Sequence, residues 1–472
     1  MLSRGLRRLV DVRPGEVGAL LLSFAYFFFL LCSYYVLRPL RDAWGIEGGT
    51  DKLPWLFTGT FLAMLAVNPL YGAVVARSSR RRIVPYVYRF FMLNILVFYA
   101  LLRLDAPRVA VGHVFFVWIS VYNVFVVAIF WSFMADLFSN EQGRRLFGFI
   151  AVGGTAGALA GPLLTKFLAT ELGTANLLLL SALLLEVCTQ CVGWLLRHCE
   201  RAGAARVVGV ESGATSDGTE VRVGGSILGG IRLVFRDRYM LGVAAQILCL
   251  TTTATFLYLL QARIVSESVQ GTDARTAAFA SIDLTVNTLE VALQLFVTAA
   301  LIRRAGLART LRVLPVLTAV GSIVLSARPT VLVLTLFQGI RRAVQYAIYR
   351  PARELLFTVV DRERKYASKG FIDTAVYRGG DWASAQLFAG LEFLGLKTAG
   401  LALAGLPVVA GWYALSGYLA RRQETLAARA APPPAPSSST SRPSSPQATL
   451  PTTTLAANVS EPEACLRPES RS

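Results

Sequence analysis

Charged residues are scarce in this sequence of 472 residues. Asp, Glu, Lys and Arg make up 16% of it, whereas soluble proteins carry about 25%. Hydrophobic residues make up 54%, and the mean hydropathy is +0.53. This balance excludes an ordinary soluble protein and predicts a protein that crosses the lipid bilayer several times.

Histidine and cysteine are also rare. The two histidines, His113 and His198, lack the spacing of metal ligands. The six cysteines are scattered, and the one close pair, Cys188 and Cys191, lies in an apolar segment where helix packing is the ordinary role. The phosphate-binding pattern GxxxxGK[ST] is absent. We therefore expect no metal and no cofactor, and we predict that the protein is not an enzyme.

Acidic residues are outnumbered by basic ones, 29 to 47, which gives a formal net charge of +18. In a soluble protein this excess would suggest nucleic acid. Here the basic residues gather in the loops on one side of the apolar runs, as in membrane proteins, whose cytoplasmic loops collect Lys and Arg. We therefore expect no nucleic-acid partner. The same rule predicts a multi-pass protein of the plasma (inner) membrane with both termini in the cytoplasm.

About twelve apolar runs are long enough to cross a bilayer, which takes about 20 residues of helix. Backbone exposed to lipid must make its hydrogen bonds within the segment, so these runs are expected to be helices. The predicted fold class is an all-α integral membrane protein. The runs lie near 16–37, 53–76, 83–103, 109–135, 146–168, 174–196, 239–260, 276–302, 310–327, 329–349, 370–394 and 396–419.

A long polar segment divides the chain. Residues 198–236, which include "ESGATSDGTE", have the composition of a linker, so we predict a cytoplasmic linker between two six-helix halves, 1–197 and 237–421. Residues 422–472 are rich in Pro, Ser and Thr, and we predict a disordered cytoplasmic tail there.

The two halves share a faint repeat. In the loop after the fourth run, and again after the tenth, a Glu is followed seven residues later by Gly-Phe-Ile, at 148–150 and at 370–372. The same loop in the same orientation indicates a parallel repeat, as in the two halves of major-facilitator transporters. The fifth run also carries Gly153, Gly157 and Gly161 on one helical face. Small residues at this spacing predict close packing against another helix.

The stretch "FQGIRRAVQYAIYRPARELLF", residues 337–357, begins in the tenth run, is long enough to cross a bilayer and carries four arginines: Arg341, Arg342, Arg350 and Arg353. An arginine at mid-membrane costs about 2.5–3.5 kcal/mol even on the lenient insertion scale. These side chains must therefore face a watery cavity, form internal ion pairs or reach an interface.

Helical spacing places Arg342, Tyr346, Tyr349 and Arg353 on one face, because they step by four, three and four. The first run ends with further cations. Guanidinium groups suit phosphate, and aromatic rings beside them could stack on a planar base. The predicted substrate-binding residues are Arg38, Arg41, Arg342, Tyr346, Tyr349 and Arg353.

Other charged residues lie within the later runs. Asp283 and Glu290 are seven residues apart, which places them on one face of the eighth run. Asp373, Arg378 and Asp381 lie in the eleventh run. These five are candidates either for carrying protons or for internal ion pairs.

Several of these segments resemble the ATP:ADP antiporters, the nucleotide exchangers of plastids and intracellular bacteria and their bacterial relatives. "YYVLRPLRD" resembles that family's YxxLRDTKD, and "FWSFMAD" its FWGFAND. "QYAIYRPARELLF" resembles its KYSLFDPCKEMAY, and "DRERKYASKGFID" its basic entry to the eleventh span. Pro39 stands at the family's first Asp, Gln345 at its Lys and Arg350 at its Asp.

The resemblance implies a twelve-helix, major-facilitator-like fold and exchange of adenine nucleotides without hydrolysis. It places Arg38 and Arg41 at the Arg and Lys of LRDTKD, and Arg353 at the Lys of DPCKE.

Three functions remain open from the sequence. The first is a transporter that exchanges or imports nucleotides, or another phosphorylated anion, by alternating access. The second is a proton-coupled carrier of another organic anion, in which Asp283 and Glu290 would carry the protons. The third is a membrane scaffold that transports nothing. In each case we expect a monomer.

Overall fold

The structure is a computed structural model that describes residues 12–13, 15–77, 80–201, 234–360, 368 and 371–430. Among these residues all regular secondary structure is helical. Most of the predicted linker, residues 202–233, and the tail from 431 onward lie outside the described residues.

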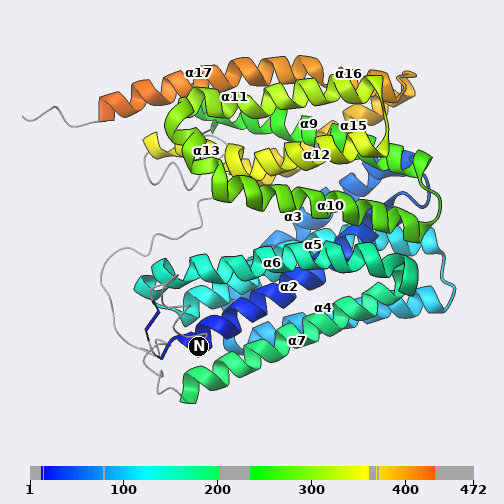
Figure 1. Cartoon of the computed structure of the whole chain (residues 1–472), viewed down its shortest axis with the longest axis vertical. Helices are drawn as coiled ribbons and strands as arrows, with labels where there is room; N and C mark the ends of the chain where they lie inside the picture. The colour runs from blue at the N-terminus through cyan, green and yellow to red at the C-terminus, as the bar shows by residue number, and fades with distance from the viewer. Residues whose placement is uncertain are drawn as a thin grey trace, which may run out of the picture. The chain divides into compact units, whose positions relative to one another are not determined.

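Six long helices make up the N-terminal half, which Figure 1 draws in blue to green. Helix α2 is packed against α5, α6 and α7, and α4 lies against α5 and α7. The short turn η1 (Thr50–Lys52) precedes α3. The helices are α2 (Val17–Gly45), α3 (Leu53–Arg77), α4 (Arg80–Arg103), α5 (Arg108–Leu137), α6 (Asn140–Leu172) and α7 (Thr174–Arg201).

The C-terminal half, drawn in green to orange in Figure 1, has more interruptions. Helices α9 (Arg238–Ser268) and α10 (Thr272–Phe296) are uninterrupted, whereas α11 (Thr298–Ala327) is kinked at Gly306, where φ is 72°. The tenth apolar run, 329–349, forms α12 (Val331–Val344) and the π-helical turn η3 (Gln345–Tyr349). Helical structure continues past the run in α13 (Arg350–Leu355) and the 3₁₀ turn η4 (Leu356–Val359). The last described elements are a second π-turn, η5 (Ile372–Val376), and the helices α15 (Tyr377–Phe393), α16 (Thr398–Ala404) and α17 (Leu406–Ala430).

The predicted fold class is confirmed: the apolar runs form helices, arranged as two halves. Eight helical segments of the described chain are long and apolar enough to cross a membrane. Helices α10, α12 and α15 are not among them, and these three carry several of the charged residues described below. The eight lie on α2, α4, α5, α6, α7, α9, α11 and the α16–α17 pair.

Two helices continue past the predicted boundaries of the halves. Helix α7 ends at Arg201 rather than 197, and α17 ends at Ala430 rather than 421. The sequence "RRQETLAARA" explains the second difference, because Arg, Gln, Glu, Leu and Ala all favour helix without needing lipid. The end of an apolar run therefore marks where the membrane segment ends, but not where the helix ends.

Helix α6 lies very close to α2 along the glycine stripe. A Cβ atom at Gly157 would lie 2.3 Å from the carbonyl oxygen of Phe28, and one at Gly153 would lie 2.5 Å from that of Phe24. A Cβ at Gly161 would lie 2.8 Å from the carbonyl oxygen of Cys32. The predicted packing role of these glycines is confirmed.

The two halves contact each other along α10, which packs against α2 and α6, and at one end of the helices. We call the end where α2 begins and α17 finishes the terminal face, and the other end the opposite face. At the opposite face the Thr174 amide donates to the Asp273 carboxylate at 2.8 Å, and the Gln386 side chain donates to the Pro54 carbonyl at 3.0 Å. A buried apolar cluster also joins the halves there, and it includes Phe116, Phe256, Phe337 and Phe388. The halves are therefore closed against each other at the opposite face.

Candidate functional site: an arginine-lined cavity between the halves

A cavity of about 280 Å³ lies between the two halves. Helices α2, α3 and α5 line it from the N-terminal half, and α9, α12, η3 and α15 line it from the C-terminal half. Its charged lining consists of two carboxylates, Asp42 and Asp381, and five arginines: Arg38, Arg41, Arg341, Arg342 and Arg378.

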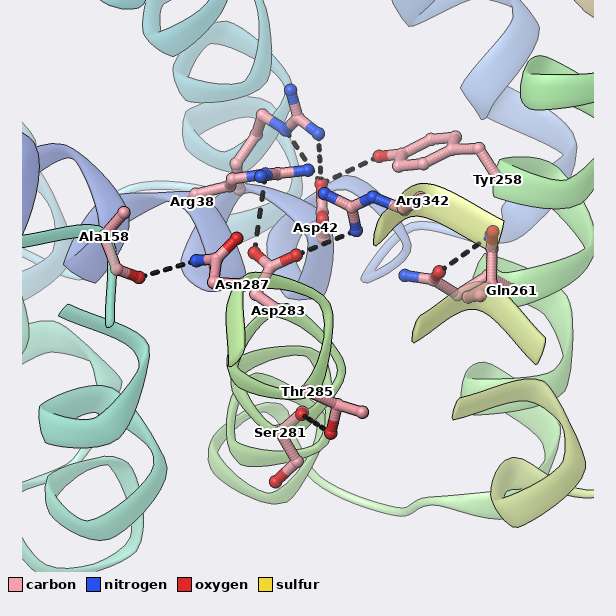
Figure 2. A network of polar contacts seen from close by, with 12 residues as sticks. Arg38, Asp42, Ala158, Tyr258, Gln261, Ser281, Asp283, Thr285, Asn287 and Arg342 are labelled. Carbon is pink, nitrogen blue, oxygen red and sulfur yellow. Dashed lines mark hydrogen bonds and ion pairs between the residues drawn. The ribbon is translucent and has the colours of Figure 1, made fainter. Parts of the chain in front are cut away.

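Two of these arginines, Arg38 and Arg342, contact the same carboxylate, that of Asp283, as Figure 2 shows. Arg342 of α12 donates to Asp283 Oδ1 at 2.9 Å, and Arg38 of α2 lies 3.4 Å from Asp283 Oδ2. The Asp283 residue is 3% exposed and does not itself line the cavity. Since α2 and α10 belong to different halves, this triad joins them. Arg342 therefore avoids the cost of burial in lipid by pairing and by facing a cavity.

Arg41 is held by its neighbour. Its Nε and Nη2 donate to Asp42 Oδ1 at 2.8 and 2.6 Å, and its guanidinium lies 4.9 Å from the centre of the Phe116 ring. Tyr258 of α9 donates to the same carboxylate oxygen at 2.8 Å. The ion pair thus also reaches across the halves.

Arg341 differs from the others because it has no carboxylate partner among the described residues. The residue is 1% exposed, it lines the cavity, and its Nε and Nη2 atoms lack hydrogen-bond partners. An unpaired buried cation is costly. We did not predict this residue as part of the site, although Gln338, Arg341 and Gln345 step by three and four and form a polar stripe that could have revealed it.

The π-turn η3 divides the face that helical spacing predicts. Pro351 has no amide hydrogen to donate to the carbonyl of Ala347, one turn earlier, and the wide turn spans the residues just before it. The irregular turn therefore ends directly before Arg350.

Beyond this turn lies a second cavity of about 340 Å³, on the side of the terminal face. Arg350 and Arg353 line it together with Tyr349. The Tyr349 hydroxyl accepts a hydrogen bond from Trp412 Nε1 at 2.9 Å, which fixes this ring in the core of the C-terminal half. The two cavities share Gln345, Tyr346, Tyr377 and Arg378 as lining residues. The predicted set is therefore divided: Arg38, Arg41 and Arg342 lie in the first cavity, Tyr349 and Arg353 in the second, and Tyr346 in both.

The remaining charged candidates do not form one group. Asp381 lines the first cavity, accepts a hydrogen bond from Thr255 at 3.2 Å and lies 3.9 Å from Arg378. Glu290 lines a separate cavity of about 180 Å³ between α2, α6 and α10. Asp373 lies in η5, and its side chain is outside the described residues.

Aromatic rings accompany the charges of the first cavity. Tyr258 and Tyr377 were not predicted as site residues, since isolated tyrosines in apolar runs give no signal of a shared cavity. The rings that line the cavity are Phe57, Phe61, Phe116, Tyr258, Tyr346 and Tyr377.

The fold is that of known transporters. The chain superposes on the crystal structure of the nucleoside transporter NupG with a TM-score of 0.59 and 11% identity, over 88% of this chain and 99% of that one. It also superposes on the POT family transporter PepTSo with a TM-score of 0.57 and 12% identity, over 87% of this chain and 98% of that one. No family model and no curated protein sequence matches the chain. The likeness shows a major-facilitator-like fold in a multi-pass membrane protein.

Proposed function

We propose that the protein is a membrane transporter that carries a phosphorylated anion of the nucleotide class by alternating access. The observation that carries this proposal is the cavity between the halves, in which five arginines face two lining carboxylates. Such a cavity repels cations and attracts an anion. Its position between two packed halves is that of a site exposed to each side in turn.

Phosphate is the anion that this chemistry favours. A guanidinium presents a planar fork of donors that matches phosphate oxygens. Arg341 has donors with no hydrogen-bond partner among the described residues, so a bound phosphate would satisfy them. Arg38 and Arg342 share a single carboxylate, so their pair retains one positive charge for the ligand.

A ring on the substrate would suit the remainder of the lining. Phe61, Tyr346 and Tyr377 present aromatic surface in the same cavity as the arginines. Aromatic side chains bind nucleobases by stacking and accept any base, because every base has a π-face. A nucleotide combines a phosphate with a planar ring, which agrees with the resemblance in sequence to nucleotide exchangers. The structural neighbour NupG is a nucleoside transporter.

The arrangement of contacts supports an inward-facing state, if the terminal face is cytoplasmic as loop charge predicts. The halves are closed at the opposite face, where Thr174 contacts Asp273 and Gln386 contacts Pro54. The second cavity continues from the first toward the terminal face. A swing of the halves that broke the contacts at the opposite face would expose the first cavity there. This movement transports without hydrolysis.

The test uses purified protein in liposomes. Uptake of labelled ATP is measured with and without ADP inside. Uptake that requires internal ADP supports nucleotide exchange, and uptake without it supports import. Arg341→Gln should abolish either one. Arg263→Gln is the matched control, because Arg263 pairs with Glu267 and Glu392 and lines none of these cavities. Absence of uptake from folded protein under both conditions would refute the nucleotide assignment.

Glu290 favours a second candidate, a proton-coupled carrier of another organic anion. It lines a cavity between the halves, and no described residue forms an ion pair or hydrogen bond with it. A carboxylate in this position could bind and release a proton as the halves move. Uptake that an uncoupler abolishes, and that Glu290→Gln also abolishes, would support this function. Uptake driven only by a counter-substrate would refute it.

A further inference from the structure

Asp283 is the best-enclosed carboxylate of the site. Its side chain is 4% exposed, and it lies behind Arg38 and Arg342 rather than on the cavity wall. Figure 2 shows the two guanidinium groups converging on it from α2 and α12. Any anion bound in the cavity would approach the same two arginines from the other side.

The charges around the first cavity can be balanced residue by residue. Five arginines line it, and they face the lining carboxylates Asp42 and Asp381. Asp283 is a third carboxylate, in contact with two of those arginines. Five positive and three negative charges leave an excess of two, so the Asp283 charge lowers the excess from three to two.

We propose that Asp283 is an internal counter-ion that determines which anion charge the cavity prefers. It is a positioning residue, because it acts through Arg38 and Arg342 and does not itself reach the cavity. The inference rests on the proposed function, since it describes selection among anionic substrates at that site. Its carboxylate competes with the substrate for the two guanidinium groups and so disfavours the most highly charged anions.

A purely structural role would not require a charge at this position. One turn along α10, Asn287 already joins the halves by donating to the Ala158 carbonyl of α6 at 2.6 Å. Buried ion pairs are often replaced by apolar residues without loss of stability. Two arginines and one carboxylate are an unbalanced set, which is useful where a further anion is to bind.

The experiment measures binding of AMP, ADP and ATP, which differ by about one negative charge each. Purified protein is titrated without magnesium, and affinities are taken from the ligand-dependent rise of the thermal unfolding midpoint. In Asp283→Asn the affinity for ATP relative to AMP should rise about tenfold, as one more unit of positive charge acts on each added negative charge. Asp283→Glu should return the ratio to the wild-type value. Glu267→Gln, which removes an exposed carboxylate outside the cavity, should leave the ratio unchanged.

A second variant serves if Asp283→Asn fails to fold. Arg342→Gln keeps the contact between Arg38 and Asp283 but removes one positive charge, so the ratio should fall about tenfold. An unchanged ratio in the folded variants overturns the inference, as does the absence of any anion binding by the wild type. Binding that shifts as expected without transport in liposomes would instead refute the proposed function and leave the inference standing.

Discussion

The hydroxyl of Tyr258 donates a hydrogen bond to the carboxylate of Asp42, with 2.8 Å between the two oxygens, across the boundary between the halves. The same carboxylate oxygen accepts from Arg41. Asp42, which lines the first cavity, therefore belongs both to the proposed anion site and to the contact between the halves. Anything that draws Arg41 away from Asp42 also alters what holds the halves together.

Tyr258→Phe should loosen the contact between the halves while it keeps the ring in place. A hydrogen bond to a charged group contributes about 1.5–3 kcal/mol. The variant should therefore unfold at a lower temperature, and a cysteine introduced at Ser120, which lines the cavity, should react faster with a soluble maleimide. The control is Tyr413→Phe on α17, a residue that is 42% exposed. Equal reaction rates in Tyr258→Phe and the parent would contradict the prediction.

Arg341→Gln should raise stability and lower affinity together. The substitution removes a buried charge that has no carboxylate partner in the part of the chain that the structure describes, which relieves a desolvation cost. It also removes the donors that we assign to phosphate, so affinity for ATP should fall about 100-fold. The unfolding midpoint of the empty protein and the binding constant are measured on the same preparation. A fall in both would show that Arg341 has an internal structural role instead.

Gly157→Ala should destabilise the N-terminal half. The added Cβ would lie 2.3 Å from the carbonyl oxygen of Phe28 and 2.9 Å from the amide nitrogen of Cys32, and both are backbone atoms that cannot rotate away. Such overpacking costs about 1–3 kcal/mol. Gly148→Ala in the same helix is the matched control, because no atom lies within 4 Å of its Cβ position. That control should be neutral or slightly stabilising, since alanine favours helix more than glycine. Equal midpoints for the two variants would disprove the close approach of α2 and α6.

Glu16, just before α2, should make stability depend on pH. Burial raises the pKa of its carboxyl group. Hydrogen bonds from Arg145, the Arg13 amide and Gln142 lower the pKa by more than burial raises it, so the pKa lies below the ordinary value for Glu. A carboxyl whose pKa is lowered by folding stabilises the folded state above its unfolded pKa. This stabilisation is lost as the pH falls through the lowered pKa of the folded protein.

The measurement is the unfolding midpoint of the wild type and of Glu16→Gln from pH 7 down to about pH 3. The wild type should be the more stable at pH 7, and the difference should shrink as the pH falls. Glu424→Gln on the exposed end of α17 is the control. A difference that stayed constant with pH would mean that Glu16 acts by shape and not by charge.

The helices could be predicted from the sequence because their signal is local. An apolar run of sufficient length has to form a helix in lipid, and most of the predicted runs lie within one helix. The run 276–302 instead extends from α10 into α11, and 329–349 and 396–419 each cover two helical elements. The site was harder, because its partners are distant in sequence. Arg342 and Asp283 are 59 residues apart, and Tyr258 and Asp42 are 216 apart. No feature of the neighbouring sequence indicates that Arg342 has a carboxylate partner, whereas Arg341, the residue before it, has none among the described residues.

The face predicted to hold Arg342 and Arg353 shows that sequence also failed to predict the site between residues close together in the chain. Spacing placed Arg342 and Arg353 on one face of a regular helix, and the structure assigns them to different cavities. The cause is the π-turn between them, which a periodicity of 3.6 residues does not include. Pro351 was the one visible sign of it.

The π-turn at 345–349 has a mechanical consequence. A π-turn holds one residue more than an α-turn, and each residue of an α-helix turns the chain by about 100°. The π-turn therefore sets the rotation of α13 about the helix axis relative to α12. If this turn tightened to a regular α-turn, Arg350 and Arg353 would rotate about the axis relative to Arg341 and Arg342. The second set of guanidinium groups could thus be turned toward or away from the path to the terminal face while the first set stayed in place.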